Sequence, residues 1–324
     1  MECKLKNMAS KNKKKFKVKT VFNENQERLS LEILNSSEGL KKDFSNEGIC
    51  VPGLALCGYT EKFPHGSILL LGRPEIFYLL SKDSIERKNI AEKLLELDVS
   101  FLVISDNLES PKELLEAADV KRVCVFRTSL DAIKLITLLS RYLDNLFAPR
   151  KTIHGTLVDV YGMGLLFTGR SGIGKSEMAL DLIERGHRLV ADDVITIVKT
   201  GDGILLGSGK EILTHHLEVR GVGIVDVLSL FGIKGVRMQK RIEVEVMLED
   251  DKDINGFDRT GLQVEFSEYL GVKIPLIRIP IYPGKNITVI AEAIAMDNIL
   301  KLYGYNTSVE FNKKLIARMK GRLK

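Results

Sequence analysis

Apolar residues in the first part of the chain follow two alternating patterns. Short apolar runs at 67–72, 99–105 and 120–126 are typical of buried strands, and 84–97 carries apolar residues at helical spacing. Strands that alternate with helices predict a mostly parallel sheet. We therefore expect an α/β domain over 17–130. It contains no phosphate loop, metal-spaced cluster or nucleophile signature, so we expect it to be non-catalytic.

The pattern changes further along the chain. A long apolar stretch at helical spacing predicts a linker helix over 131–150. The second domain, 151–324, is rich in strand patterns, with hairpins expected over 155–168 and 195–207. Apolar and charged residues alternate over 241–248, which predicts a half-exposed strand.

Composition excludes several classes of protein. The 324 residues are 44% apolar, and no run reaches the roughly 18–20 apolar residues of a membrane span. The net charge of +5 is concentrated at the two ends, so the body between them is acidic and offers no basic groove for nucleic acid. We expect 1–16 to be a disordered basic tail. The four cysteines form no C-x-x-C pair, which fits a reducing cytoplasm.

The segment 169–176 fits the phosphate-binding pattern G-x-x-x-x-G-K-[ST]. A predicted strand precedes it and a predicted helix follows it, as this motif requires. Its glycines let backbone amides face phosphate oxygens, Lys175 reaches the terminal phosphates, and the Ser176 hydroxyl ligates Mg²⁺. The predicted nucleotide contacts are Gly169, Arg170, Ser171, Gly172, Ile173, Gly174, Lys175 and Ser176, with Glu177 directly after them.

Two carboxylates follow one helix later. The apolar strand 189–191 ends at Asp192 and Asp193. In phosphoryl-transfer enzymes such acids hold Mg²⁺ or accept a hydroxyl proton. The alternative is a pair of surface acids that simply end a strand.

Four further residues are candidates on weaker grounds. Glu218 and Arg220 lie in a glycine-rich stretch and fit either a Mg²⁺ contact with a phosphate clamp or a structural salt bridge. Arg259 lies in a predicted loop after an acidic run. His154 comes shortly before the strand of the phosphate loop, and it is the one histidine of five that we single out.

Together these segments resemble the bifunctional HPr kinase/phosphorylase family of bacteria. The resemblance is carried by 169–177, 190–194 and 217–227. It implies an N-terminal α/β domain and a C-terminal P-loop domain resembling the nucleotide-binding core of phosphoenolpyruvate carboxykinases. It also implies a homohexamer that uses Mg²⁺ and ATP, or pyrophosphate, to phosphorylate a serine of the phosphocarrier protein HPr. The reverse phosphorolysis with inorganic phosphate would link this activity to carbon catabolite repression.

The family pattern assigns roles to the matching residues. It implies that Asp193 accepts the proton of the serine hydroxyl and returns it in the reverse reaction, with Asp192 in support. It implies that Ser176 and Glu218 hold Mg²⁺. The catalytic set implied by the resemblance is His154, Lys175, Asp192, Asp193 and Arg259.

Two parts of the chain depart from the family pattern. The second position of the loop is usually acidic, and here it is Arg170. The stretch tied to phosphorolysis usually reads like P-x-R-P-G-R, and here it is Pro280, Ile281, Tyr282, Pro283, Gly284 and Lys285. Tyr282 replaces an arginine, and Lys285 keeps the charge but loses the bidentate geometry. These changes predict a weaker phosphorylase activity beside an intact kinase.

Two other functions fit the same residues. One is a nucleotide-sensing regulatory protein, whose first domain binds a partner while the loop reports ATP. The other is a kinase for a small metabolite.

Overall fold

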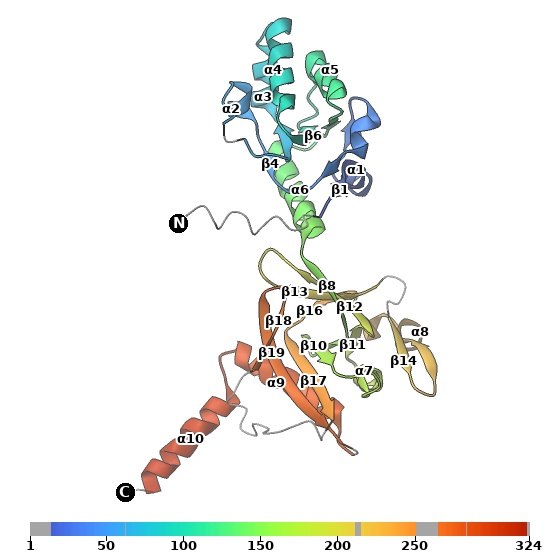
Figure 1. Ribbon diagram of the computed structural model, residues 1–324. Helices are drawn as coiled ribbons and strands as arrows, with labels where there is room; N and C mark the ends of the chain where they lie inside the picture. Colours follow the sequence, from blue (N-terminus) through green and yellow to red (C-terminus); the bar gives the residue numbers. More distant parts are fainter. Residues whose placement is uncertain (1–13, 62, 211–214, 251–264, 283, 323–324) are drawn as a thin grey trace. The chain divides into compact units, whose positions relative to one another are not determined.

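The computed structural model describes residues 14–61, 63–210, 215–250, 265–282 and 284–322. The chain divides into two compact units, 1–147 and 148–324 (Figure 1). Most of the tail expected over 1–16 lies outside the described residues. None of the helices in the described ranges is long and apolar enough to cross a bilayer.

Unit 1 is built around a five-stranded sheet of order β2-β7-β6-β5-β4, in which β2 is antiparallel to its neighbour and the other pairs are parallel. Every residue of β5 and β6 is buried, because α2 to α5 cover one face and α1 and α6 the other. The three parallel pairs confirm the expected, mostly parallel sheet. The elements are β1 (Phe16–Lys17), α1 (Val18–Asn25), β2 (Glu32–Ile33), η1 (Ser37–Lys41), β3 (Asp43–Phe44), β4 (Ile49–Cys50), α2 (Gly53–Leu56), β5 (Ser67–Leu71), α3 (Arg73–Leu80), α4 (Ser84–Glu96), β6 (Val99–Ile104), α5 (Lys112–Val120), β7 (Cys124–Arg127) and α6 (Ala132–Phe147).

The helical pattern over 131–150 corresponds to α6, the last element of unit 1. Leu135, Leu139 and Leu143 follow one another at four-residue spacing on one face, and all three are buried. They pack in a core that includes Phe101 and Phe126 of the sheet. The apolar face of α6 is thus used within unit 1.

Unit 2 consists of three layers (Figure 1). A six-stranded sheet of order β11-β9-β10-β17-β19-β18 shares one core with the four-stranded sheet β16-β13-β12-β8, and another with α7, α9 and the β14–β15 hairpin. The expected hairpins are β9–β10 and β12–β13. The elements are β8 (Arg150–His154), β9 (Thr156–Val160), β10 (Met163–Thr168), α7 (Lys175–Glu184), β11 (Arg188–Ala191), β12 (Val194–Lys199), β13 (Leu205–Gly209), β14 (His216–Val219), β15 (Gly223–Asp226), α8 (Val227–Phe231), η3 (Ile233–Gly235), β16 (Gln239–Arg241), β17 (Val244–Asp250), β18 (Glu265–Tyr269), β19 (Val272–Ile281), α9 (Ile287–Leu302) and α10 (Thr307–Arg322).

Strand β17 is more buried than the half-exposed strand predicted over 241–248, because Val244, Glu245, Val246 and Leu248 are buried and Met247 is half-buried. Val244 and Val246 belong to the core shared with the helices. Glu245 is 2% exposed, and it is in register with Leu166, which lies in the core between the two sheets. The alternation misleads because the second sheet covers the face that carries the acid.

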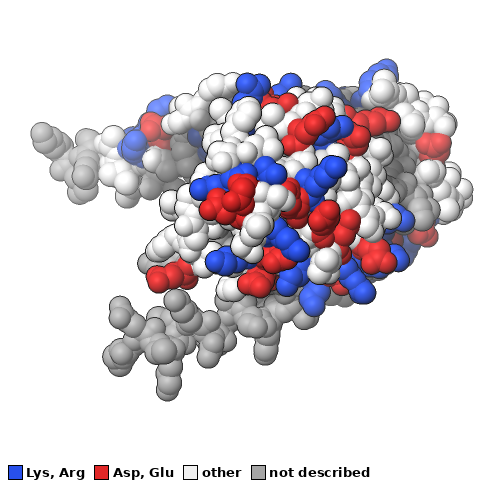
Figure 2. Space-filling model, turned by 90° about the horizontal axis from the view of Figure 1, so that it is seen from above, with Lys and Arg blue, Asp and Glu red and all other residues white. Residues whose placement is uncertain are grey.

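Surface charges of opposite sign are interspersed on the face shown in Figure 2. Exposed ion pairs of the chain include Arg122 with Glu38 at 3.6 Å and Lys313 with Glu310 at 2.8 Å. Exposed pairs of this kind contribute little to stability, about 0–1 kcal/mol each. The fold therefore depends mainly on its apolar cores.

Gly164 allows a close approach inside unit 2 that gives a test of the fold. A Cβ at this position would overlap the carbonyl oxygen of Arg241 and come within 2.9 Å of a Glu243 carboxylate oxygen. Backbone cannot move aside as a flexible side chain can, so we expect Gly164→Ala to destabilise unit 2 by about 1–3 kcal/mol.

Gly201→Ala is the matched control, because a Cβ at Gly201 meets nothing within 4 Å. Thermal unfolding of the full chain should show a drop of several degrees for the first variant and about one degree or less for the second. Equal melting temperatures would contradict the close packing of β10 on residues 241–243.

Candidate active site

A glycine-rich loop joins β10 to α7, which confirms the predicted order of strand, loop and helix. Gly169, Gly172 and Gly174 have φ angles of 137°, 75° and 101°, which side-chain-bearing residues rarely adopt. Ile173 between them is buried in the core that α7 shares with the sheet. The path of the loop therefore requires both its glycines and its one apolar anchor.

Lys175 and Ser176 begin α7 and bond in two directions. The Lys175 ammonium donates to the carbonyl oxygens of Gly169 at 3.1 Å and Arg170 at 3.0 Å, so it bridges back across the loop. The Ser176 hydroxyl donates to Asp192 Oδ2 at 2.7 Å. Lys175 thus contacts the loop, and Ser176 contacts an acid that directly follows β11.

Asp192 and Asp193 lie between β11 and β12 and differ in exposure. Asp192 is 7% exposed, and its carboxylate accepts from Ser176 Oγ and, at 2.5 Å, from Thr156 Oγ1. Asp193 has a φ of 63°, and its side chain is 69% exposed. A bond of 2.7 Å from the Val194 amide to the Asp192 carbonyl closes this turn. The buried acid is fixed in place, and the exposed acid is accessible to a substrate.

His154 ends β8 beside the same turn. It is in register with Val194 of β12. Its Nδ1 lies 3.2 Å from the Asp193 carbonyl oxygen and 3.6 Å from Asp193 Oδ1. The structure therefore brings together two candidates that are 39 residues apart in the sequence.

The β14–β15 hairpin contributes Arg220 and Glu218. A Cβ on Gly172 would overlap the Arg220 guanidinium, so this cation lies directly against the glycine-rich loop. Glu218 is exposed on β14. Within the described ranges no ion pair joins Glu218 to Arg220, which leaves the guanidinium beside the loop as the feature of interest.

Ser176 and Asp192 have the oxygen ligands that suit Mg²⁺. No three His, Cys, Asp or Glu side chains of the described part of the chain are grouped so as to hold a metal ion by themselves. Mg²⁺ usually keeps several waters and binds one or two carboxylates together with substrate phosphates. A hydroxyl and a carboxylate 2.7 Å apart at the start of α7 therefore fit this ion.

Arg170 forms a bidentate ion pair with Asp250, the last residue of β17. Its Nε lies 2.5 Å from Asp250 Oδ2, and its Nη2 lies 2.9 Å from Asp250 Oδ1. Asp250 is not among the residues predicted from the sequence. A pattern read along the chain contains no signal for a partner 80 residues away.

Thr156 and Glu245 were also missed. Glu245 accepts from the Thr168 hydroxyl at 2.6 Å and the Tyr269 hydroxyl at 2.9 Å. Burial, with the nearby Glu245 carboxylate, raises the pKa of Tyr269. Thr156 and Glu245 come from different strands of the sheet. The first bonds to Asp192, and the second bonds to Thr168, the residue before the loop.

The segment that follows β19 folds back on itself. The Lys285 ammonium donates to the Pro280 carbonyl at 2.8 Å and lies 4.9 Å from the centre of the Tyr282 ring. Gly284 has a φ of 87°. Lys285 therefore makes both a hydrogen bond and a cation–π contact within its own segment.

The remaining predicted residues are placed as follows. Glu177 is exposed in the first turn of α7, where an acid favours the helix dipole. Ser171 is exposed in the loop. Arg259 and Pro283 lie outside the described residues.

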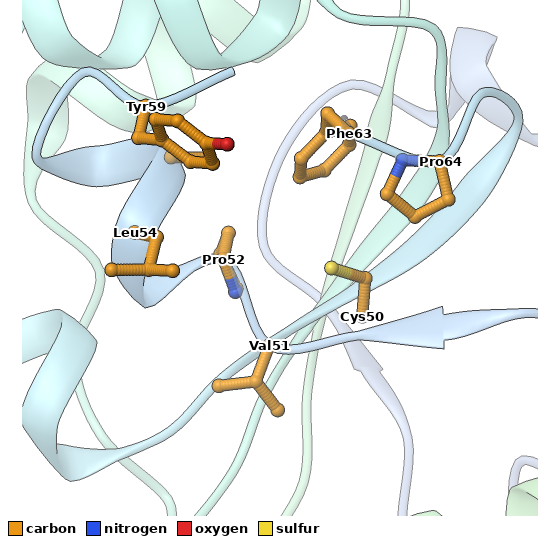
Figure 3. Close-up of a pocket in the computed structure, with 8 residues that line it drawn as sticks. Cys50, Val51, Pro52, Leu54, Tyr59, Phe63 and Pro64 are labelled. Atoms are coloured by element: carbon orange, nitrogen blue, oxygen red, sulfur yellow. The ribbon is translucent and has the colours of Figure 1, made fainter. Parts of the chain in front are cut away.

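Unit 1 has a pocket of about 190 Å³, shown in Figure 3. Its lining consists of Tyr59, Phe63 and other mainly apolar side chains, together with the Cys50 thiol. Burial raises the pKa of Cys50, which disfavours the reactive thiolate. The pocket's lining supplies neither a carboxylate nor a cation, in contrast to the site around the glycine-rich loop.

Comparison with known proteins gives consistent results for both units. Residues 16–143 match the HPr Serine kinase N terminus, and 145–315 match the HPr Serine kinase C-terminal domain. The HPr kinase/phosphorylase of Chloroherpeton thalassium is 42% identical over 305 residues, 94% of this chain and 90% of that protein. The HPr kinase/phosphorylase of Halalkalibacterium halodurans is 39% identical over 299 residues, 92% and 96% of the two chains.

A solved structure of the Hpr(Ser) kinase/phosphatase from Coxiella burnetii aligns with a TM-score of 0.46 and 34% identity. The alignment covers 50% of this chain and 98% of that one. The matches to the two domains and to full-length relatives extend over nearly all of the sequence. The chain belongs to the HPr kinase/phosphorylase family.

Proposed function

We propose that the chain transfers a phosphoryl group from ATP, or from pyrophosphate, to a serine hydroxyl of the phosphocarrier protein HPr. With inorganic phosphate it would also run the reverse phosphorolysis, and so regulate carbon catabolite repression. The observation that carries the proposal is an exposed carboxylate, Asp193, held next to Asp192, which bonds to the first turn of the loop's helix. The names of the full-length relatives supply the substrate.

In the forward direction, Asp193 accepts the proton as the serine oxygen attacks the terminal phosphorus. A bond forms between that oxygen and phosphorus, and the bond to the bridging oxygen of the leaving group breaks. In phosphorolysis the same carboxyl returns the proton to the leaving serine. His154 is 3.6 Å from this carboxylate, where it helps to orient it.

The loop is proposed to bind phosphates as a P-loop, on a domain of the phosphoenolpyruvate carboxykinase kind. Lys175 exchanges the two loop carbonyls for phosphate oxygens, which are stronger partners for an ammonium group. Arg220, against Gly172, adds a second cation on the hairpin side. Mg²⁺, when bound, neutralises charge on the phosphate oxygens. Ser176 and Asp192 would hold it, with Glu218 as a further candidate.

The segment 280–285 favours a kinase whose phosphorylase activity is weak. In the proposed reverse reaction, a cation must hold inorganic phosphate in line with phosphoserine. Lys285 instead bonds to the Pro280 carbonyl and the Tyr282 ring, and Tyr282 carries no charge. The segment therefore offers less positive charge to a phosphate ion than two arginines would.

Assembly as a homohexamer in the cytoplasm is part of the proposal. Large apolar side chains are exposed along the two C-terminal helices, among them Val289, Met296, Phe311 and Met319. Apolar surface that a monomer would leave in water favours association.

Asp193→Asn should abolish transfer and leave nucleotide binding intact. The amide cannot accept the serine proton, so we expect phosphoserine formation on HPr to fall by about 10²–10⁴-fold, with the Kd for Mg·ATP little changed. The exposed Asp202→Asn is the matched control. Phosphoserine is measured by mass spectrometry of HPr.

Full transfer by the Asp193 variant would remove this residue as the base. If the unsubstituted protein binds ATP but does not modify HPr, a nucleotide-sensing regulatory protein is favoured. Transfer to a small hydroxyl compound alone would favour a metabolite kinase.

Tyr282→Arg combined with Lys285→Arg should raise phosphorolysis selectively. We expect pyrophosphate release from phosphoseryl-HPr to rise by about tenfold relative to kinase activity, because two guanidinium groups can hold phosphate bidentately. Tyr303→Arg adds the same charge at an exposed tyrosine away from the segment and should change neither rate. An unchanged ratio in the double variant would count against a weakened reverse reaction.

The hexamer is tested by analytical ultracentrifugation. We expect a particle of six chains of 36.3 kDa each, and Phe311→Lys with Met319→Lys should shift it toward smaller species. A monomer in the unsubstituted protein would overturn the proposed assembly.

A further inference from the structure

Arg170 lies within the proposed phosphate loop, yet its guanidinium is engaged elsewhere. Two of its nitrogens bond to the two carboxylate oxygens of Asp250 in a fork-to-fork arrangement. Asp250 ends β17, the strand that pairs in parallel with the strand preceding the loop. The backbone of Arg170 belongs to the loop, while its side chain connects the loop to the neighbouring strand.

β17 contacts the last residue of β10 and the first two residues of the loop. Glu245 accepts from the Thr168 hydroxyl at 2.6 Å. Gly169 faces the Leu248 carbonyl so closely that a Cβ would lie 2.5 Å from its oxygen. Asp250 then holds Arg170. Since all three attachments come from one strand, the first limb of the loop follows β17.

The Arg170 pair is not needed for global stability. The side chains are 62% and 39% exposed, and an ion pair so open to water contributes only about 0–1 kcal/mol. Its effect is local. The carbonyl of Arg170, like that of Gly169, accepts from the Lys175 ammonium, so the pair holds one of the two groups that position this lysine.

We propose that Arg170 is a positioning residue, whose bidentate pair with Asp250 fixes the loop carbonyls that hold Lys175 ready for phosphate. The guanidinium acts through the backbone and does not contact phosphate. This inference rests on the proposed function in one respect, that the loop binds the phosphates of a nucleotide.

Charge reversal and exchange test the pair. The variants are Arg170→Asp, Asp250→Arg and the double exchange, and the probes are Mg·ATP and inorganic pyrophosphate. Each single variant should raise the Kd for both probes by about tenfold, and the double exchange should recover most of that loss. Melting temperatures of all three should stay within about 2 °C of the unsubstituted protein.

Arg278→Asp is the matched control. Arg278 pairs with Glu249, next to Asp250 on the same strand, and with Glu265. No hydrogen bond or ion pair joins Arg278 to the loop among the described residues. Arg278→Asp should leave both Kd values within about twofold of the unsubstituted protein.

A direct phosphate contact by Arg170 predicts a different pattern. Asp250→Arg would then bind as well as or better than the unsubstituted protein, and the double exchange would stay weak.

Amide hydrogen exchange gives a readout without nucleotide. Exchange over 169–174 should accelerate in each single variant and slow again in the double exchange, with no change in Arg278→Asp. Unchanged exchange in the single variants would overturn the positioning role even if the protein phosphorylates HPr. Accelerated and rescued exchange without transfer to HPr would retain the positioning role and reject the proposed substrate.

Discussion

The site depends on one buried carboxylate, that of Asp192. Burying a charged group costs free energy unless hydrogen bonds compensate for it, and Asp192 receives two, from Thr156 and Ser176. These three residues come from β9, the start of α7 and the turn after β11, so the bonds join separate parts of unit 2. The carboxylate of Asp192 is fixed in this way. Asp193, the next residue, adopts a positive φ, and its side chain lies in solvent. Fixing one acid thus makes its neighbour accessible.

Local signals made much of this predictable from sequence. Glycines at 169, 172 and 174 are needed because the backbone enters conformations closed to other residues, and this requirement is visible in the residue types themselves. The strands and helices on either side of the loop follow from the periodicity of apolar positions. The family resemblance put both His154 and Asp193 in the catalytic set, but nothing local predicts that they are neighbours, because one lies on β8 and the other in a turn 39 residues away.

Long-range pairing accounts for what the sequence did not reveal. The alternating pattern predicted that Glu245 lies on the exposed face of its strand. In the structure Glu245 is buried, because a second sheet lies over that face. Asp250 belongs to the acidic run that precedes Arg259, where no partner was predicted, and it holds Arg170. The burial of Glu245 and the pairing of Asp250 with Arg170 both depend on the parallel register of β10 with β17. This register is a property of two segments far apart in the chain. Patterns of period two or 3.6 describe one segment at a time.

Helix capping distinguishes α7 from α4 and α9. The amides at the start of α4 and α9 are occupied by Asp83 and Asn286, which accept from the third residue of each helix. α7 begins after Gly174, and no side chain caps it. Its first amides therefore keep their partial positive charge for a ligand. A glycine at this position costs helix stability. That cost is consistent with a site kept open for phosphate, since a capping acid would occupy the same amides.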